Sequence, residues 1–171
     1  MRLATVAEEN ALLGFLNAME EGLADRVVGD GALGVVERDG IRFVVVTSQR
    51  VAGLPEALLA NALSVGLPLG VLEGDGFQLD LQGAMRVANH TKAQTLRVTE
   101  QSAQLFLYGR NVLGDSILWH EPSLRRGDAC IVCNGRGEAL GLGVVVGPFK
   151  GPRQAVRPVQ DLGTYLRDQH E

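Results

Sequence analysis

Short β-forming segments alternate with glycine-bearing turns through the second half of the chain. Of all the features of the sequence, this alternating pattern most limits the folds that the chain can adopt. Each segment is only four to nine residues long. Several short strands at this spacing are typical of a small barrel or sandwich. The predicted strands are residues 95–98, 116–120, 129–134, 138–146 and 155–159.

Two helices are predicted to accompany these strands. Thr99 is a favourable helix cap, Glu100 suits a first helical turn, and Gly109 stands where a helix would end. We therefore expect a helix over residues 100–108 and a second, closing helix over residues 161–168.

The first half mixes helices with paired strands. Thr5 and Glu8 form a capping box, and apolar residues then recur at helical spacing, at Leu12, Phe15, Leu16, Met19 and Leu23. Two hairpins follow, one formed by residues 34–37 with 41–47 and the other by residues 69–72 with 77–81. Two further helices are predicted at residues 54–63 and 83–89. The pattern predicts an α+β chain with two domains. The amino-terminal domain, residues 1–94, is an antiparallel sheet with helices, and the second domain, residues 95–171, is small and β-barrel-like.

Composition and charge indicate an ordinary globular protein. Of its 171 residues 46% are hydrophobic and 21% charged, and the formal net charge is −4. Residues 1–94 carry 7 Lys and Arg with 12 Asp and Glu, whereas residues 95–171 carry 9 with 8. Lys150, Arg153 and Arg157 lie in a stretch without acidic residues, so a polyanion is expected to bind the second half, unless these cations merely form a solvated face.

The expected compartment is the cytoplasm. No basic leader with an apolar run and cleavage site opens the chain, and no segment approaches the roughly 18 apolar residues of a membrane span, so no membrane partner is expected. Two cysteines are too few for a disulfide framework.

Cys130 and Cys133 have the spacing of a redox pair or of half a zinc site. They lie in a predicted strand, and no second Cys or His pair with ligand spacing follows. We interpret them as core or half-buried thiols. His90, His120 and His170 are scattered, so we expect no catalytic residue, metal or cofactor.

Two glycine-rich segments have alternative interpretations. Residues 29–34 fit G-x-G-x-x-G, but a β run follows instead of a helix, so a turn is expected there and not a phosphate loop. Gly141 and Gly143 interrupt an apolar strand, which indicates a tight bend or bulge, a bare backbone that another backbone or a nucleic-acid sugar approaches closely, or both together.

Residues 100–114, with a helix followed by Gly-x-x-Val and a loop glycine, resemble the opening of a PUA domain, the RNA-binding module named for pseudouridine synthases and archaeosine transglycosylases. Residues 124–133 are similar to the turn and strand of that family. The Leu-Gly-Leu-Gly strand at 140–143 and Asp-Leu-Gly-Thr-Tyr-Leu-Arg at 161–167 resemble a narrower group, the archaeal homologues of the Nip-seven large-subunit ribosome-biogenesis family.

The resemblance implies which residues face RNA: Gly109, Arg110 and Gly114 beside the first helix of the second domain, and Lys150, Arg153 and Arg157 before the last helix. If the strand is regular, Arg153 and Arg157 share a face and could follow successive phosphates.

The predicted function is a noncatalytic RNA-binding factor in large ribosomal subunit assembly and pre-rRNA processing. Its expected partners are ribosomal RNA or its precursor, together with other ribosome-assembly or RNA-processing proteins that contact residues 1–94. The alternatives are a protein-interaction adaptor of an RNA-processing complex, and an RNA-modification enzyme or its accessory subunit.

Overall fold

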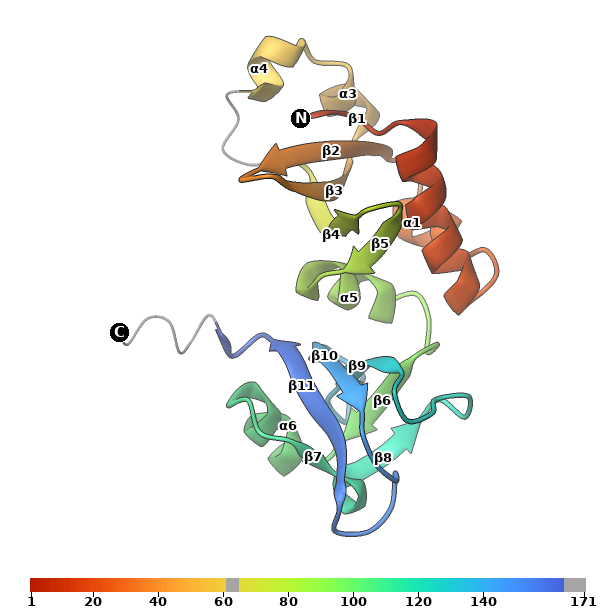
Figure 1. Cartoon of the computed structure of the whole chain (residues 1–171), viewed down its shortest axis with the longest axis vertical. Coiled ribbons are helices and arrows are strands. Elements are labelled where there is room, and N and C mark those ends of the chain that lie inside the picture. The colour runs from red at the N-terminus through yellow and green to blue at the C-terminus, as the bar shows by residue number, and fades with distance from the viewer. Residues whose placement is uncertain (61–64, 165–171) are drawn as a thin grey trace. The chain divides into compact units, whose positions relative to one another are not determined.

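The structure is a computed structural model that describes residues 1–60 and 65–164. The chain divides into two compact units, Met1–Arg86 and Val87–Glu171 (Figure 1). The predicted boundary after residue 94 falls in the short segment between α5 (Leu81–Ala88) and β6 (Thr95–Val98). In the described ranges no helix is long and apolar enough to cross a membrane.

The first helix begins as predicted. Thr5 caps α1 (Val6–Met19), and both halves of the capping box with Glu8 are present. Leu12 and Leu16 are fully buried. The predicted continuation to Leu23 is wrong, because the chain turns at Gly22, whose φ is +71°, and Leu23 starts a separate helix, α2 (Leu23–Val28).

An antiparallel sheet of five strands forms the rest of the first unit's core, in the order β1, β2, β3, β4, β5. A two-residue turn with positive φ at Asp39 and Gly40 closes the predicted hairpin of β2 and β3. Residues 29–31 connect a helix to a strand, so no phosphate loop forms. The strands are β1 (Arg2–Leu3), β2 (Ala32–Arg38), β3 (Ile41–Thr47), β4 (Leu67–Glu73) and β5 (Gly76–Leu79).

Short helices complete this unit. The segment predicted as one helix at 54–63 is preceded by an unpredicted turn of helix, α3 (Gln49–Ala52), and contains α4 (Glu56–Ala60). Residues 61–64 lie outside the described ranges. The predicted helix at 83–89 is α5, which starts two residues earlier.

The second unit is a curled six-stranded sheet in the order β7, β11, β10, β9, β6, β8. Its edge strands, β7 (Val112–Leu113) and β8 (Ile117–His120), are joined by only one turn of 3-10 helix, η1 (Gly114–Ser116). Because so short a connection spans opposite edges, the sheet must curl into a half-barrel. The other strands are β9 (Ala129–Cys133), β10 (Ala139–Val145) and β11 (Gln154–Asp161).

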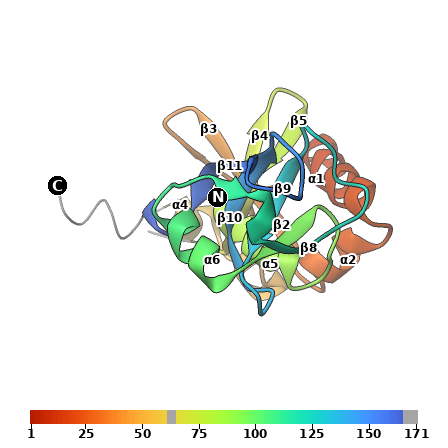
Figure 2. The same ribbon diagram turned by 90° about the horizontal axis from the view of Figure 1, so that it is seen from below.

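One helix covers this half-barrel. Thr99 caps α6 (Glu100–Leu107) by accepting a hydrogen bond from the Ser102 amide, and Gly109 follows with φ +73°. The helix contacts β10 and β11 (Figure 2). Its Phe106 side chain is fully buried in the core of this unit. Mixed α+β architecture is thus confirmed.

The two glycines of β10 are explained by the chain's own packing. A Cβ atom on Gly141 would lie 2.2 Å from the Gln160 carbonyl oxygen, and one on Gly143 would lie 2.5 Å from Val156. The register with β11 also shifts between Leu142 and Gly143. The strand therefore has a bulge at this point, and the bare backbone at Gly141 also allows another backbone, that of β11, to approach closely. The space proposed for a nucleic-acid sugar is occupied by β11.

The predicted closing helix does not begin at Asp161. Asp161 is the last residue of β11 and pairs with Gly141, and a turn follows at 162–163. Residues 165–171, which hold the second half of the predicted helix as well as His170, lie outside the described ranges.

Candidate nucleic-acid interface

Two segments that are far apart in sequence join into one surface. The loop connecting β10 and β11, residues 147–153, lies against the end of β7 and the start of η1. The Gly114 amide donates to the Arg153 carbonyl at 2.9 Å, and the Asp115 amide donates to the Gly151 carbonyl at 2.9 Å. In return the Gly151 amide donates to Oδ1 of Asp115 at 2.7 Å.

Gly114 allows this close approach. A Cβ atom there would lie 2.7 to 2.8 Å from backbone atoms of Lys150 and from the Pro148 carbonyl oxygen, closer than real Cβ atoms come to other atoms. The predicted residues on both sides, Gly109 to Gly114 and Lys150 to Arg157, are therefore parts of one continuous structure through β7, which pairs with β11.

The predicted cations are available for a ligand. Arg110, Lys150, Arg153 and Arg157 are all exposed. Across residues 1–60 and 65–164, the ion pairs involve other arginines only. An acceptor such as phosphate would thus meet guanidinium and ammonium groups that pair with no carboxylate of the described residues.

The condition for Arg153 and Arg157 to share a face is not met. The register with β7 shifts between Gln154 and Val156, so Ala155 is an extra residue in β11 at this point. Such a bulge breaks strict alternation, so a spacing of four no longer places the two arginines on one face.

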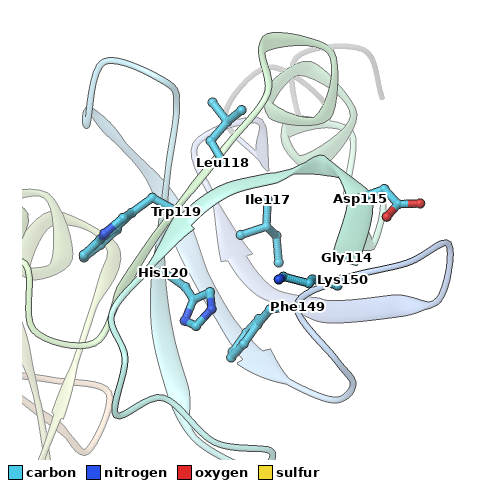
Figure 3. Close-up of a pocket in the computed structure, with 8 residues that line it drawn as sticks. All are labelled: Gly114, Asp115, Ile117, Leu118, Trp119, His120, Phe149 and Lys150. Atoms are coloured by element: carbon cyan, nitrogen blue, oxygen red, sulfur yellow. The ribbon is translucent and has the colours of Figure 1, made fainter.

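A pocket of about 440 Å³ opens beside this junction (Figure 3). Its wall combines η1 and β8 with the tip of the 147–153 loop. Ile117 and Lys150 point toward its centre, whereas Trp119 points away from it (Figure 3). The residues that line the pocket are Gly114, Asp115, Ile117, Leu118, Trp119, His120, Phe149 and Lys150.

Two stacked rings form one wall of the pocket. The rings of His120 and Phe149 lie with centroids 4.1 Å apart and an interplanar angle of 26°. Nδ1 of His120 lies 3.1 Å from the Glu121 carbonyl oxygen, which can only accept. In the neutral ring Nδ1 therefore carries the proton, and Nε2 presents an acceptor lone pair.

The cysteines lie in the core of the second unit. Cys130 and Cys133 are free and buried, as interpreted from the sequence. Burial raises the pKa of the Cys130 thiol to about 12 and that of Cys133 to about 11. Both side chains are therefore neutral thiols at physiological pH. Elsewhere in the described ranges, no three His, Cys, Asp or Glu side chains gather as metal ligands would.

Sequence reasoning missed the pocket. Its residues come from two segments about thirty residues apart, and the predicted sites included only Gly114 and Lys150 among them. Asp115 and Phe149 carried one weak signal: each is next to a residue already predicted to face RNA, Gly114 and Lys150. His120 carried no such signal.

The second unit of the chain matches a known family of domains. Residues 94–170 match the model of the UPF0113 PUA domain. A UPF0113 protein of Aeropyrum pernix is 35% identical over 106 residues, which are 61% of this chain and 57% of that relative. The match therefore spans somewhat more than half the length of the curated relative.

Solved structures share the fold of this chain. A PUA-domain protein of Aeropyrum pernix covers 96% of it with a TM-score of 0.62 and 19% identity, over 87% of its own length. A conserved PUA domain protein of Thermoplasma acidophilum covers 99% of both chains with a TM-score of 0.60 and 13% identity. A hypothetical protein of Pyrococcus horikoshii covers 94% of this chain and 93% of its own, with a TM-score of 0.68 and 14% identity.

Proposed function

We propose that this protein is a noncatalytic RNA-binding factor that binds RNA on the surface formed by residues 109–115 and the 147–157 segment. The observation that carries the proposal is the backbone junction at Gly114 and Asp115. It unites the two predicted RNA-facing segments and leaves their cations exposed without ion pairs in the described ranges. The match of residues 94–170 to a PUA domain supports the same ligand class.

The proposed RNA is ribosomal RNA or its precursor, and the proposed role is large-subunit assembly, as the resemblance to the Nip-seven family implies. Its protein partners would bind residues 1–94. The noncatalytic role agrees with the neutral state of the two buried thiols, since a thiolate is the reactive form of cysteine.

A charge-removal experiment tests RNA binding. Replacing Lys150, Arg153 and Arg157 with Ala removes three exposed cations, and we expect affinity for a fluorescent single-stranded ribosomal RNA fragment to fall about tenfold or more. Fluorescence anisotropy at fixed salt measures the dissociation constant.

A matched control separates local contacts from total charge. Arg50, Lys92 and Arg136 are also exposed, and no ion pair between described residues includes them. Replacing these three with Ala makes the same change in net charge and should leave the affinity within about twofold. Equal losses in both variants, or no loss in the first, would contradict the proposed surface.

A separate experiment tests the proposed ribosomal role. Crosslinking of the protein to RNA in cell extract, followed by sequencing of the attached fragments, should recover large-subunit ribosomal RNA. Fragments that map elsewhere would refute the ribosomal assignment and leave RNA binding intact.

A further inference from the structure

We propose that the pocket beside η1 binds one unstacked base of a single-stranded RNA, with the adjacent phosphate on Lys150. This inference rests on the proposed function and adds a base-binding subsite to a surface that otherwise offers only phosphate contacts. Three features of the pocket carry it: a ring wall, polar groups at its edge, and its size.

The ring wall suits a planar ligand. His120 and Phe149 already stack on each other at 4.1 Å, and both line the pocket. A base entering the pocket would extend this stack or lie edge-on to it. Bases stack on aromatic side chains whatever their sequence, because every base has a π face.

The wall is held in place from both sides. His120 belongs to β8 and its Nδ1 lies 3.1 Å from the Glu121 carbonyl oxygen. Phe149 lies in the 147–153 loop, which the hydrogen bonds at Gly114 and Asp115 fasten to η1. A preformed site loses less conformational entropy when it binds a ligand.

Polar groups at the pocket could bind the edge of a base and its backbone. Nε2 of the neutral His120 ring is an acceptor without a hydrogen-bond partner in the described part of the chain. Asp115 uses Oδ1 for the Gly151 amide, which leaves Oδ2 to accept an exocyclic amine or a ribose hydroxyl. Lys150 is an exposed ammonium group that points into the pocket (Figure 3).

The volume of about 440 Å³ falls within the range of small-molecule sites, roughly 300 to 1,000 Å³, and accommodates a nucleotide. A base within a duplex could not enter, since its faces are covered by neighbouring base pairs and its edge is paired. The pocket therefore selects unpaired RNA.

The sole tryptophan of the chain reports on this site. Trp119 is one of the residues at the pocket, although its ring points away from the centre (Figure 3), and the residue is 37% exposed. We expect the full-length protein to show a change in tryptophan fluorescence when titrated with hexauridylate. A hexamer of the same ribose-phosphate backbone without bases should bind about five- to tenfold more weakly, because stacking is lost.

Paired variants localise the effect. His120→Ala should remove most of the difference between the two hexamers, whereas His90→Ala, which changes an exposed histidine outside the pocket, should preserve it. Phe149→Leu, which keeps an apolar side chain, gives the same readout with less risk to folding. Circular dichroism confirms that each variant is folded.

Lysine labelling gives a second readout. The chain has only two lysines, and both are exposed. Bound hexauridylate should protect Lys150 from acetylation by an amine reagent and leave Lys92 reactive, as mass spectrometry would show.

Four results would overturn the inference. Equal affinity for the normal and base-free hexamers would leave the proposed RNA surface standing and eliminate the base pocket. A difference that persists in both His120→Ala and Phe149→Leu would place the base elsewhere. A response to free uridine monophosphate without any response to hexauridylate would indicate a small-molecule site. Failure of both hexamers to bind would refute the inference together with the proposed function.

Discussion

Glu8 is a buried carboxylate that joins three parts of the first unit. Arg2 donates two hydrogen bonds to it, at 2.6 and 2.7 Å, and the Thr5 amide donates a third at 2.9 Å. Arg42 from β3 lies 3.5 Å from the same carboxylate. The Arg2 guanidinium is the main cause that lowers the pKa of Glu8 to about 2.

This pKa predicts a pH-dependent contribution to stability. The contribution is complete above pH 4.5, the ordinary pKa of glutamate, and is lost as the pH falls from about 4.5 to about 2. Glu8→Gln should therefore lower Tm at pH 7, and the difference from the parent should shrink across that window. Thermal unfolding followed by circular dichroism measures it.

Glu9 provides the comparison, since it lies in the same turn and no ion pair between described residues includes it. Glu9→Gln should show a smaller, less pH-dependent change. A constant gap between Glu8→Gln and the parent from pH 7 to pH 2 would contradict the argument.

The two cysteines yield a chemical prediction. Because burial raises their pKa values to about 12 and about 11, both stay protonated and shielded in the folded protein. We expect a thiol-reactive disulfide reagent at pH 8 to react with neither thiol until the protein is unfolded in guanidinium chloride, when both should react. Rapid reaction of the native protein, read by absorbance, would show that the thiols are accessible.

At the scale of elements, one glycine decides whether η1 and the 147–153 loop can meet. Gly114→Ala places a Cβ atom 2.7 to 2.8 Å from the loop backbone, which must then move. The expected result is a loss of stability of about 1 to 3 kcal/mol and weaker RNA binding. Denaturant unfolding and fluorescence anisotropy measure the two effects.

Gly135→Ala is a suitable control for that variant. A Cβ atom at Gly135 would make only an ordinary contact, 3.6 Å from Leu118, and its φ is not positive. Its RNA affinity should stay close to that of the parent. If Gly114→Ala bound RNA as well as Gly135→Ala does, the junction would not organise the surface.

At the scale of the whole molecule, the two halves of the chain carry net charges of opposite sign, and this difference determines where RNA can bind. The chain has net charge −4, so binding must come from a local group of cations and not from the overall field. Four phosphate contacts, at Arg110, Lys150, Arg153 and Arg157, predict a slope of about −3 in a plot of log affinity against log salt.

The Lys150, Arg153 and Arg157 triple variant should reduce the magnitude of that slope to about 0.7, since each contact contributes about −0.7. Titrations at several potassium chloride concentrations measure it. An unchanged slope in the triple variant, with weaker affinity, would mean that these residues support the fold and do not contact phosphates.

Much of the fold could be read from local patterns. The capping box at Thr5, the cap at Thr99 and the turn at Asp39 and Gly40 each involve residues at most a few positions apart. The sequence alone therefore predicted the helices and the hairpin that these residues begin or close. The exceptions were places where the backbone conformation changes within a few residues, as at Gly22, where an apolar pattern continues while the helix stops.

The sequence by itself determined the α+β class, the β-rich second half and the segments that carry the candidate RNA-binding residues. Only the tertiary structure decided that residues 109–115 and 147–153 meet, that Gly141 and Gly143 accommodate the chain's own packing, and that His120 stacks on Phe149. The physical reason is that the curl of the sheet and the bulge at Ala155 set these contacts, and both depend on strand register across distant segments.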